Sequence, residues 1–215
     1  MMDFHRYHCL WSSSLIFLVL LMWPSDVYGG PDERRLLKDL LENYNTLERP
    51  VYNESEPVEL EFVITLQQII NVDEVNQVLT TNLWLNLQWS DFNMKWNKSE
   101  YGSIEDIRIP PSKIWMPDVF LYNSADEAFD ATFPTNVVVT HEGNCLYVPP
   151  GIFKTTCKMD MTWFPFDDQE CTLKFGSWTH NGWKLNLKLN GEEGDTSSYV
   201  LNDKWVLLGR YNFFL

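Results

Sequence analysis

Long apolar runs and positive charge are both scarce in this chain of 215 residues. Beyond residue 29, no stretch approaches the roughly 18 consecutive apolar residues that predict a transmembrane helix, so no such helix is expected. Lysine and arginine number 16 against 30 acidic residues, and the net charge of −14 excludes a nucleic-acid binder that works by neutralising phosphates. The chain also has no internal repeat and no glycine-rich phosphate loop.

Patterns typical of catalytic sites are lacking as well. His141-Glu142 and Asp167-Asp168 come nearest to a catalytic group. Neither pair has a third partner at a recognisable spacing. The sequence therefore predicts a protein that is not an enzyme, and no pattern in it implies a cofactor.

The composition and the N-terminus predict a folded, secreted protein. Apolar residues make up 45% of the chain and aromatic residues 15%, which favours a packed core over disorder. An apolar run over residues 15–23, ended by Pro24, is typical of a signal peptide and is about half as long as a membrane span. We therefore expect residues 1–29 to direct the chain into the secretory pathway. Asn53 and Asn97 each begin an N-glycosylation sequon, which fits that route.

The secreted chain would keep three cysteines, so one thiol stays free or pairs with another chain. Cys157 and Cys171 enclose 13 residues, and closing a loop of this size stabilises a fold by about 3 kcal/mol. The loop is either a disulfide-closed hairpin or the carrier of an apolar tip, residues 164–166, that docks outside the domain. No histidine or third cysteine lies at ligand spacing, so we expect no metal site.

Hydrophobic periodicity predicts one helix followed by strands. Pro31 and Asp32 begin the helix, with Asp32 as its N-cap, and an apolar stripe at helical spacing continues to Tyr44. From residue 58 the period changes to two, which is typical of strands. Alternating apolar residues occupy residues 58–66, 83–89 and 185–189. The pattern predicts an all-β fold, an antiparallel β-sandwich with an N-terminal α-helix.

One tryptophan breaks the alternation of the second predicted strand. Leu83, Leu85 and Leu87 form its apolar face, so Trp84 points to the opposite face beside polar residues. A tryptophan that faces outward indicates contact with another chain, with a ligand or with a covering loop.

Several motifs resemble those of one receptor family. The disulfide-sized loop over residues 157–171 contains Phe-Pro-Phe-Asp, which resembles the signature of the Cys-loop pentameric ligand-gated ion channels. Residues 115–118 and 121–126 resemble the first ligand-binding loop of nicotinic acetylcholine receptors. Residues 176–179 resemble the second such loop, and residues 149–153 resemble alpha-seven-type, homomer-forming subunits.

The resemblance runs from about Gly30 to Gly209 and implies the extracellular domain of a nicotinic receptor subunit. It implies a disulfide between Cys157 and Cys171, and a buried free thiol at Cys145. As part of a receptor, the domain would lie on the extracellular side of the plasma membrane or synapse, and it would be secreted if the truncation is real.

The resemblance also implies an aromatic box for acetylcholine or a related cationic agonist, each ring contributing about 0.5 to 2 kcal/mol. Tyr122 and Trp178 would belong to its principal face, with His180 beside them or at the rim. A neighbouring subunit of a pentamer would supply the complementary face, including Trp84. The other complementary residues, which could instead face a core, are Leu146, Val148 and Val138.

Two loops are implied to contact the membrane helices and to pass the binding signal to the gate. One is the stretch that follows the first predicted strand, and the other is the tip of the disulfide loop. Their implied coupling residues are Asp73, Glu74, Phe164, Pro165, Phe166 and Asp167.

The chain departs from the family near its end. Residues 203–206 resemble the strand before the third ligand-binding loop, whereas residues 210–215 look unlike the family. The third loop and the four membrane helices are absent, so we expect the domain over residues 30–209 to be incomplete. Such a chain would not conduct ions alone and would reach a membrane only through the missing helices. It would bind agonist weakly or not at all.

These expectations leave two functional hypotheses. The first is the extracellular ligand-binding domain of an acetylcholine-gated cation channel subunit of alpha-seven type, represented by a truncated chain. The second is a secreted protein that captures or modulates full-length subunits, or a soluble transmitter-binding protein. Soluble acetylcholine-binding proteins keep the third loop, which favours subunit capture over ligand sequestration.

Overall fold

The computed structural model describes residues 30–190 and 194–208. The predicted signal peptide over residues 1–29 and the tail over residues 210–215 lie outside these ranges. Within them, one α-helix, α2 (Pro31–Leu41), precedes a series of strands and two short 3-10 turns. The strands are β1 (Val58–Asp73), β2 (Val78–Ser90), β3 (Asp106–Ile109), β4 (Val119–Leu121), β5 (Val137–Thr140), β6 (Asn144–Tyr147), β7 (Pro150–Thr156), β8 (Phe175–Ser177) and β9 (Leu185–Leu189). The 3-10 turns are η1 (Lys98–Glu100) and η2 (Pro111–Lys113).

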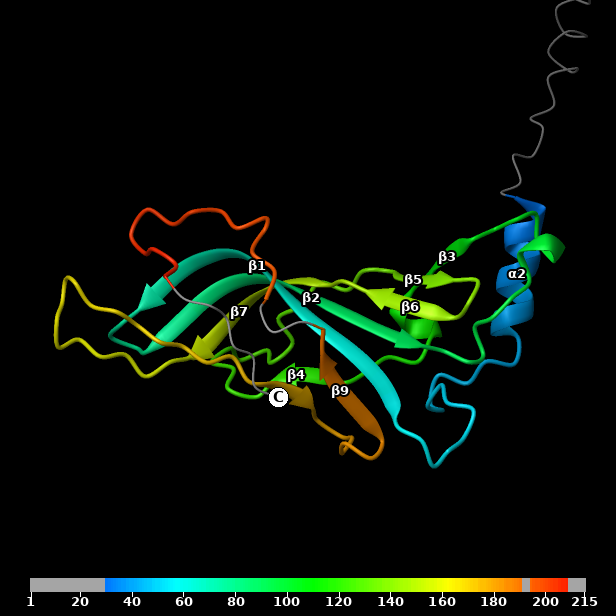
Figure 1. The fold of residues 1–215 in the computed structure, drawn as a ribbon, viewed down its shortest axis with the longest axis horizontal. Helices are drawn as coiled ribbons and strands as arrows, with labels where there is room; N and C mark the ends of the chain where they lie inside the picture. Colours follow the sequence, from blue (N-terminus) through cyan, green and yellow to red (C-terminus); the bar gives the residue numbers. More distant parts are fainter. Residues whose placement is uncertain (1–29, 191–193, 209–215) are drawn as a thin grey trace, which may run out of the picture.

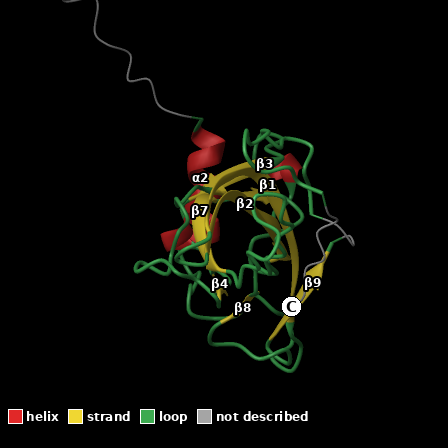
Figure 2. Ribbon diagram, turned by 90° about the vertical axis from the view of Figure 1, so that its left-hand side faces the viewer, coloured by secondary structure: helices red, strands yellow, loops and turns green. Residues whose placement is uncertain are grey.

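The described strands form two sheets that face each other, which confirms the predicted β-sandwich (Figures 1 and 2). The larger sheet has the order β3-β5-β6-β2-β1-β9, with β7 also paired to β2, and the smaller sheet joins β4 to β8. Neighbouring strands are antiparallel except β1 and β9, which pair in parallel. None of the helices in the described ranges is long and apolar enough to cross a membrane.

The two longest strands build the core from alternating residues. Phe62 of β1 lies opposite Leu87 of β2, Ile64 lies opposite Leu85, and all four side chains are buried. Full burial of each such side chain contributes about 1.5 to 3 kcal/mol. Every second residue of β2 therefore points inward, and the residues between them form the outer face of the large sheet.

The helix begins differently from the prediction, so the assignment of Asp32 as N-cap is wrong. Gly30 is the N-cap, it provides no side-chain cap, and Pro31 occupies the first turn. Proline suits that position because its fixed φ is helical and its missing N–H would have had no partner in any case. Asp32 instead forms an ion pair of 3.1 Å with Arg35, within the exposed first turn.

A buried polar network ties the chain after α2 to the end of β2. Asp91 is fully buried, and the hydroxyl of Tyr44 donates a hydrogen bond of 2.6 Å to its Oδ2. The backbone N–H of Trp115 donates to the same hydroxyl at 3.0 Å. Burial raises the pKa of Asp91 and also raises the pKa of the free, buried Cys145 thiol. Because both groups stay in the interior, the network acts as a structural link.

We expect Tyr44→Phe to lower the free energy of unfolding by about 1 to 3 kcal/mol, because it leaves a buried acceptor without its donor. Urea denaturation followed by tryptophan fluorescence measures the loss. Tyr101→Phe is the matched control, since it removes a 3.1 Å bond to Asp39 in an exposed setting and should cost less than about 0.5 kcal/mol. Equal losses in the two variants would contradict the network's role.

Candidate ligand-binding site

The smaller sheet places Tyr122 and Trp178 side by side. Leu121 of β4 pairs with Phe175 of β8 and Val119 pairs with Ser177, so Tyr122 and Trp178 follow opposite ends of this antiparallel pair. The two rings are 5.8 Å apart between centroids and are inclined by 67°. Tyr122 is 47% exposed and Trp178 is 63% exposed. The pair therefore offers aromatic surface to solvent, which is the chemistry that attracts an organic cation.

Gly176 allows the tyrosine to take this position. A Cβ atom at residue 176 would lie 2.7 Å from the Tyr122 hydroxyl oxygen and 2.9 Å from a ring carbon. The ring thus packs directly on the backbone of β8, and its hydroxyl donates a hydrogen bond to the carbonyl oxygen of Ser177. Only glycine leaves this space free.

Asp118 holds the loop that carries Trp178. Its carboxylate accepts hydrogen bonds of 2.6 Å from the Ser177 hydroxyl and from both the N–H and the hydroxyl of Thr179. The carbonyl oxygen of Asp118 accepts a further bond of 3.1 Å from the Trp178 N–H. Burial alone would raise the pKa of Asp118, but these hydrogen bonds and the charge of nearby His180 outweigh it and lower that pKa. The side chain is thus a positioning group for the indole.

Phe129 is a further aromatic neighbour of Trp178. The two rings are 6.4 Å apart and inclined by 65°, so the indole has edge contacts with Tyr122 and with Phe129. Phe129 has a φ of 56°, a left-handed backbone conformation that residues other than glycine rarely adopt. Asp126 braces this turn, since it accepts the Ala128 N–H at 3.0 Å and forms an ion pair of 3.0 Å with Lys154 of β7.

His180 lies at the rim of the aromatic pair. Its backbone N–H donates to the Ser177 hydroxyl at 3.0 Å, and its side chain is partly buried. Among the described ring contacts, none joins His180 to Tyr122 or Trp178. Its place in the principal face therefore stays a prediction.

The predicted complementary residues gather on the outer face of the large sheet. Trp84 of β2 is 42% exposed, as the alternation of the strand predicts. Leu146 of β6 lies opposite Gln88 of β2 and opposite Val138 of β5, and both apolar side chains are half-buried. Val148 comes directly after β6, two residues after Leu146, and is also half-buried. These residues lie on or beside the large sheet and the aromatic pair lies beside the smaller one, and no hydrogen bond or ring contact among the described residues joins the two groups.

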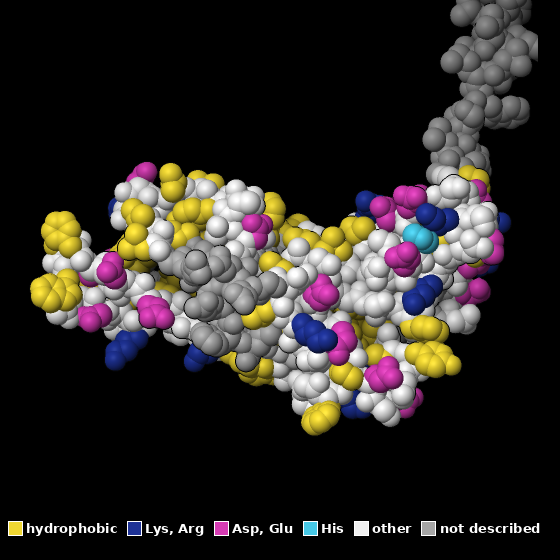
Figure 3. All heavy atoms as spheres, viewed as in Figure 1, with side chains coloured by type: hydrophobic (Ala, Val, Ile, Leu, Met, Phe, Trp, Pro, Cys, Tyr) yellow, Lys and Arg dark blue, Asp and Glu magenta, His cyan; other side chains and the backbone are white. Residues whose placement is uncertain are grey.

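The disulfide loop presents its apolar tip to solvent. Cys157 and Cys171 are joined by a disulfide, and the tip residues Phe164 and Phe166 are 65% and 90% exposed. Figure 3 shows hydrophobic side chains gathered at the end of the molecule where this loop lies. Pro165 lies between the two phenylalanines.

The loop between β1 and β2 completes the predicted coupling region. Asp73 accepts two hydrogen bonds of 2.8 Å from Asn76, which lower the pKa of its carboxyl group. Glu74 and Asp167 line one cavity beneath the disulfide loop. Two of the predicted coupling segments therefore meet in the fold.

Both sequon asparagines are exposed and lie in turns. Asn53 accepts the Ser55 N–H at 3.1 Å. Asn97 is the N-cap of η1 and also donates to Glu100 at 3.1 Å. Both positions are accessible to modification, which stays a prediction.

Sequence reasoning did not single out Asp118, Gly176 or Phe129 as individual contributors. Asp118 and Gly176 lie within the family-like motifs, but their contacts join segments almost 60 residues apart. Phe129 sits in a loop with no periodic signal. Only the folded arrangement brings these residues to Trp178.

An exposed aromatic pair on a β-sandwich with a disulfide loop defines a ligand-binding domain of the Cys-loop receptor class. The family model of the neurotransmitter-gated ion-channel ligand binding domain matches residues 33–213, and the chain belongs to this family. This confirms the predicted resemblance to nicotinic receptor subunits.

Named relatives agree with this assignment. The chain is 52% identical over 193 residues to the acetylcholine receptor subunit alpha-type acr-16 of Caenorhabditis elegans, covering 90% of this chain and 38% of that protein. It is 45% identical over 198 residues to the beta-type subunit unc-29 of Caenorhabditis elegans, covering 91% and 40%. It is 42% identical over 194 residues to the neuronal acetylcholine receptor subunit alpha-3 of Homo sapiens, covering 90% and 38%. The chain thus spans about two fifths of the length of these relatives, which are receptor subunits and include both alpha and beta types.

We expect Asp118→Asn to lower the free energy of unfolding by about 1 to 3 kcal/mol at pH 7, because charge-assisted hydrogen bonds become neutral ones. Since the folded pKa is lowered, the carboxylate stabilises the fold above its unfolded pKa of about 3.9. That contribution disappears as the pH falls through the lower folded value, so the two proteins should converge in acid.

Urea titrations at pH 7 and at acidic pH measure this difference. Asp160→Asn is the control, because Asp160 accepts similar bonds from Thr162 in an exposed loop. A gap between Asp118→Asn and the parent chain that widens in acid would contradict the assignment.

We expect Phe129→Leu to change the environment of Trp178, because it removes an aromatic edge contact worth about 0.5 to 1.5 kcal/mol. Fluorine NMR of the chain labelled with 5-fluorotryptophan shows this as a shifted and broadened Trp178 signal, assigned through Trp178→Phe. Phe133→Leu is the control, since Phe133 is 70% exposed and has no described ring contact. An unmoved Trp178 signal in Phe129→Leu would exclude a positioning role.

Proposed function

We propose that this chain is the extracellular ligand-binding domain of an acetylcholine-gated cation channel subunit of alpha-seven type. The observation that carries the proposal is the exposed, edge-to-face pair of Tyr122 and Trp178, whose loop is held by Asp118. The relatives named above are all acetylcholine receptor subunits, which supports the same ligand class.

The ligand would be acetylcholine or a related cationic agonist, bound through ring faces. Tyr122, Trp178 and His180 would form the principal side of the site. Because Trp84 faces outward from the other sheet, a second subunit of a pentamer would present its own Trp84 to this side. Leu146, Val148 and Val138 would then provide the apolar surroundings of the cation.

The proposal places the domain outside the cell. The predicted signal peptide, the exposed sequons at Asn53 and Asn97, and the disulfide all fit the secretory pathway. The coupling role belongs to residues 73–74 and 164–167, which lie at one end of the molecule.

A second candidate is capture of full-length subunits by this chain. The observation that favours it is the outer face of the large sheet, where Trp84, Leu146 and Val138 are partly open to solvent. Such a face could pair with the aromatic side of another subunit. Co-expression with a full-length acr-16 subunit tests this candidate, because capture predicts co-purification that Trp84→Asp reduces.

For the leading proposal, we expect Trp178→Phe to weaken carbamylcholine binding by about two- to thirtyfold, the range of one cation–π contact. Calorimetric titration of the secreted full chain measures the affinity. Trp183→Phe is the matched control, because Trp183 is 84% exposed and has no described partner in the aromatic pair. Equal affinities of the parent chain and Trp178→Phe would refute the assigned site.

A further inference from the structure

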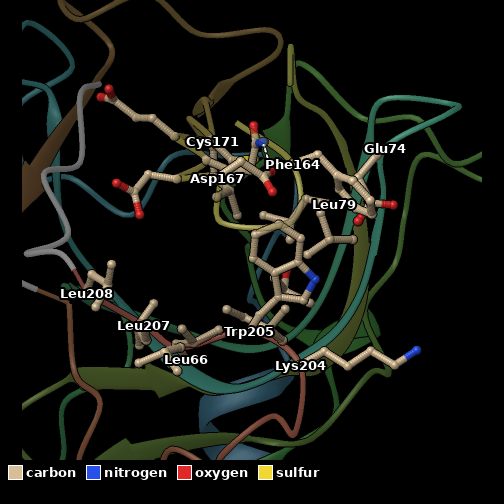
Figure 4. A pocket seen from close by; sticks show the side chains of 18 of the residues that line it. Leu66, Glu74, Leu79, Phe164, Asp167, Cys171, Lys204, Trp205, Leu207 and Leu208 are labelled. Carbon is tan, nitrogen blue, oxygen red and sulfur yellow. Dashed lines mark hydrogen bonds between the residues drawn. The ribbon is translucent and has the colours of Figure 1, made fainter. Parts of the chain in front are cut away.

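A cavity of about 870 Å³ lies inside the sandwich, away from the aromatic pair. Its floor is the inner face of β1 and β2, its roof is the disulfide loop, and residues 204–208 close one side (Figure 4). Trp205 projects into this space between the disulfide-loop residues and Leu66. The apolar wall on β1 and β2 consists of Ile64, Leu66, Ile69, Val72, Leu79 and Leu83. A volume in the range of about 300 to 1,000 Å³ with mainly apolar walls is typical of small-molecule sites.

The rim of the cavity carries an excess of negative charge. Among the described residues, four acidic residues line it against one base, Lys204, which gives these residues a formal charge of −4 + 1 = −3. Lys204 extends outward from the rim, so its ammonium group does not fill the cavity (Figure 4). Among the described residues, no hydrogen bond or ion pair engages the carboxylates of Asp168 and Glu170. These charges remain available to a cation.

A buried hydroxyl group lies on the floor. Thr81 of β2 lines the cavity and is only 2% exposed, and its Oγ1 has no hydrogen-bond partner in residues 30–190 and 194–208. A buried donor without a partner carries a desolvation cost, which a ligand acceptor placed in the cavity would relieve. The hydroxyl group therefore marks a place for one polar atom at the apolar end.

We propose that this cavity binds a small organic cation with an apolar body and one hydrogen-bond acceptor. The apolar body would contact β1, β2 and Trp205, the acceptor would bind the Thr81 hydroxyl group, and the ammonium group would face the acidic rim. This site shares no residue with the aromatic pair and goes beyond the agonist function. Because Glu74 and Asp167 line the same cavity, an occupant would touch both predicted coupling segments.

Calorimetric titration of the secreted full chain with propranolol tests the proposal. This probe combines a naphthalene ring, ether and hydroxyl oxygens and an ammonium group. The anion 1-naphthyloxyacetate shares the ring and the ether but carries a carboxylate, so it should bind at least about tenfold more weakly near the acidic rim. Equal affinity for the two probes would overturn the proposal.

Thr81→Val should weaken propranolol binding by about three- to tenfold, the value of one hydrogen bond. Thr155→Val is the matched control, because Thr155 of β7 is also buried, its hydroxyl group likewise lacks a partner in the described part of the chain, and it does not line the cavity. Its affinity should stay unchanged. Equal weakening by the two substitutions would overturn the proposal.

Further measurements show whether the probe binds elsewhere and whether another part of the protein fills the cavity. Trp178→Phe and competing tetramethylammonium should leave propranolol binding unchanged, whereas displacement would place the probe at the aromatic pair and overturn the cavity site. Binding that appears only after removal of residues 209–215 would show that the chain's own tail fills the cavity. Sedimentation that shows a dimer dissociated by the probe would identify a second copy as the occupant. Either result would overturn the proposal.

Discussion

The pairing register of β1 with β2 decides on which side of the large sheet Trp84 lies. Phe62 opposite Leu87 and Ile64 opposite Leu85 bury one face of both strands. A slip of β2 by one residue would expose Leu85 and Leu87 and move Trp84 into the core, at a cost of the apolar burial of that strand. The same burial that stabilises the fold therefore keeps Trp84 at the surface.

The smaller sheet contributes few hydrogen bonds, so its functional loops need additional constraints. β4 and β8 are each three residues long, and loops beyond such short strands would be mobile by themselves. Asp118 supplies the missing constraint with three side-chain hydrogen bonds to the loop of Trp178. Gly176 adds a steric constraint, because the Tyr122 ring packs in the space that a side chain at residue 176 would occupy. Two exposed rings can thus keep a fixed angle.

The sequence allows correct prediction of whatever depends on periodicity or on contiguous motifs. The strand faces, the outward Trp84 and the sandwich follow from alternation, because burial imposes a period of two on each strand. The N-cap at Asp32 was wrong, since proline at the first turn shifted the start to Gly30. The parallel pairing of β9 with β1 and the contact of Phe129 with Trp178 join distant segments, which no local pattern encodes.

The acidic residues of this chain serve two different purposes, and their hydrogen bonding separates them. The carboxylate of Asp118 accepts hydrogen bonds from Ser177 and Thr179 of its own chain. It therefore acts on a ligand only by holding the loop of Trp178. Asp168 and Glu170 have no such donors among the described residues, and their field extends into an apolar cavity. A net charge of −14 would therefore favour cations at the cavity rim, whereas the aromatic pair would select them through ring faces.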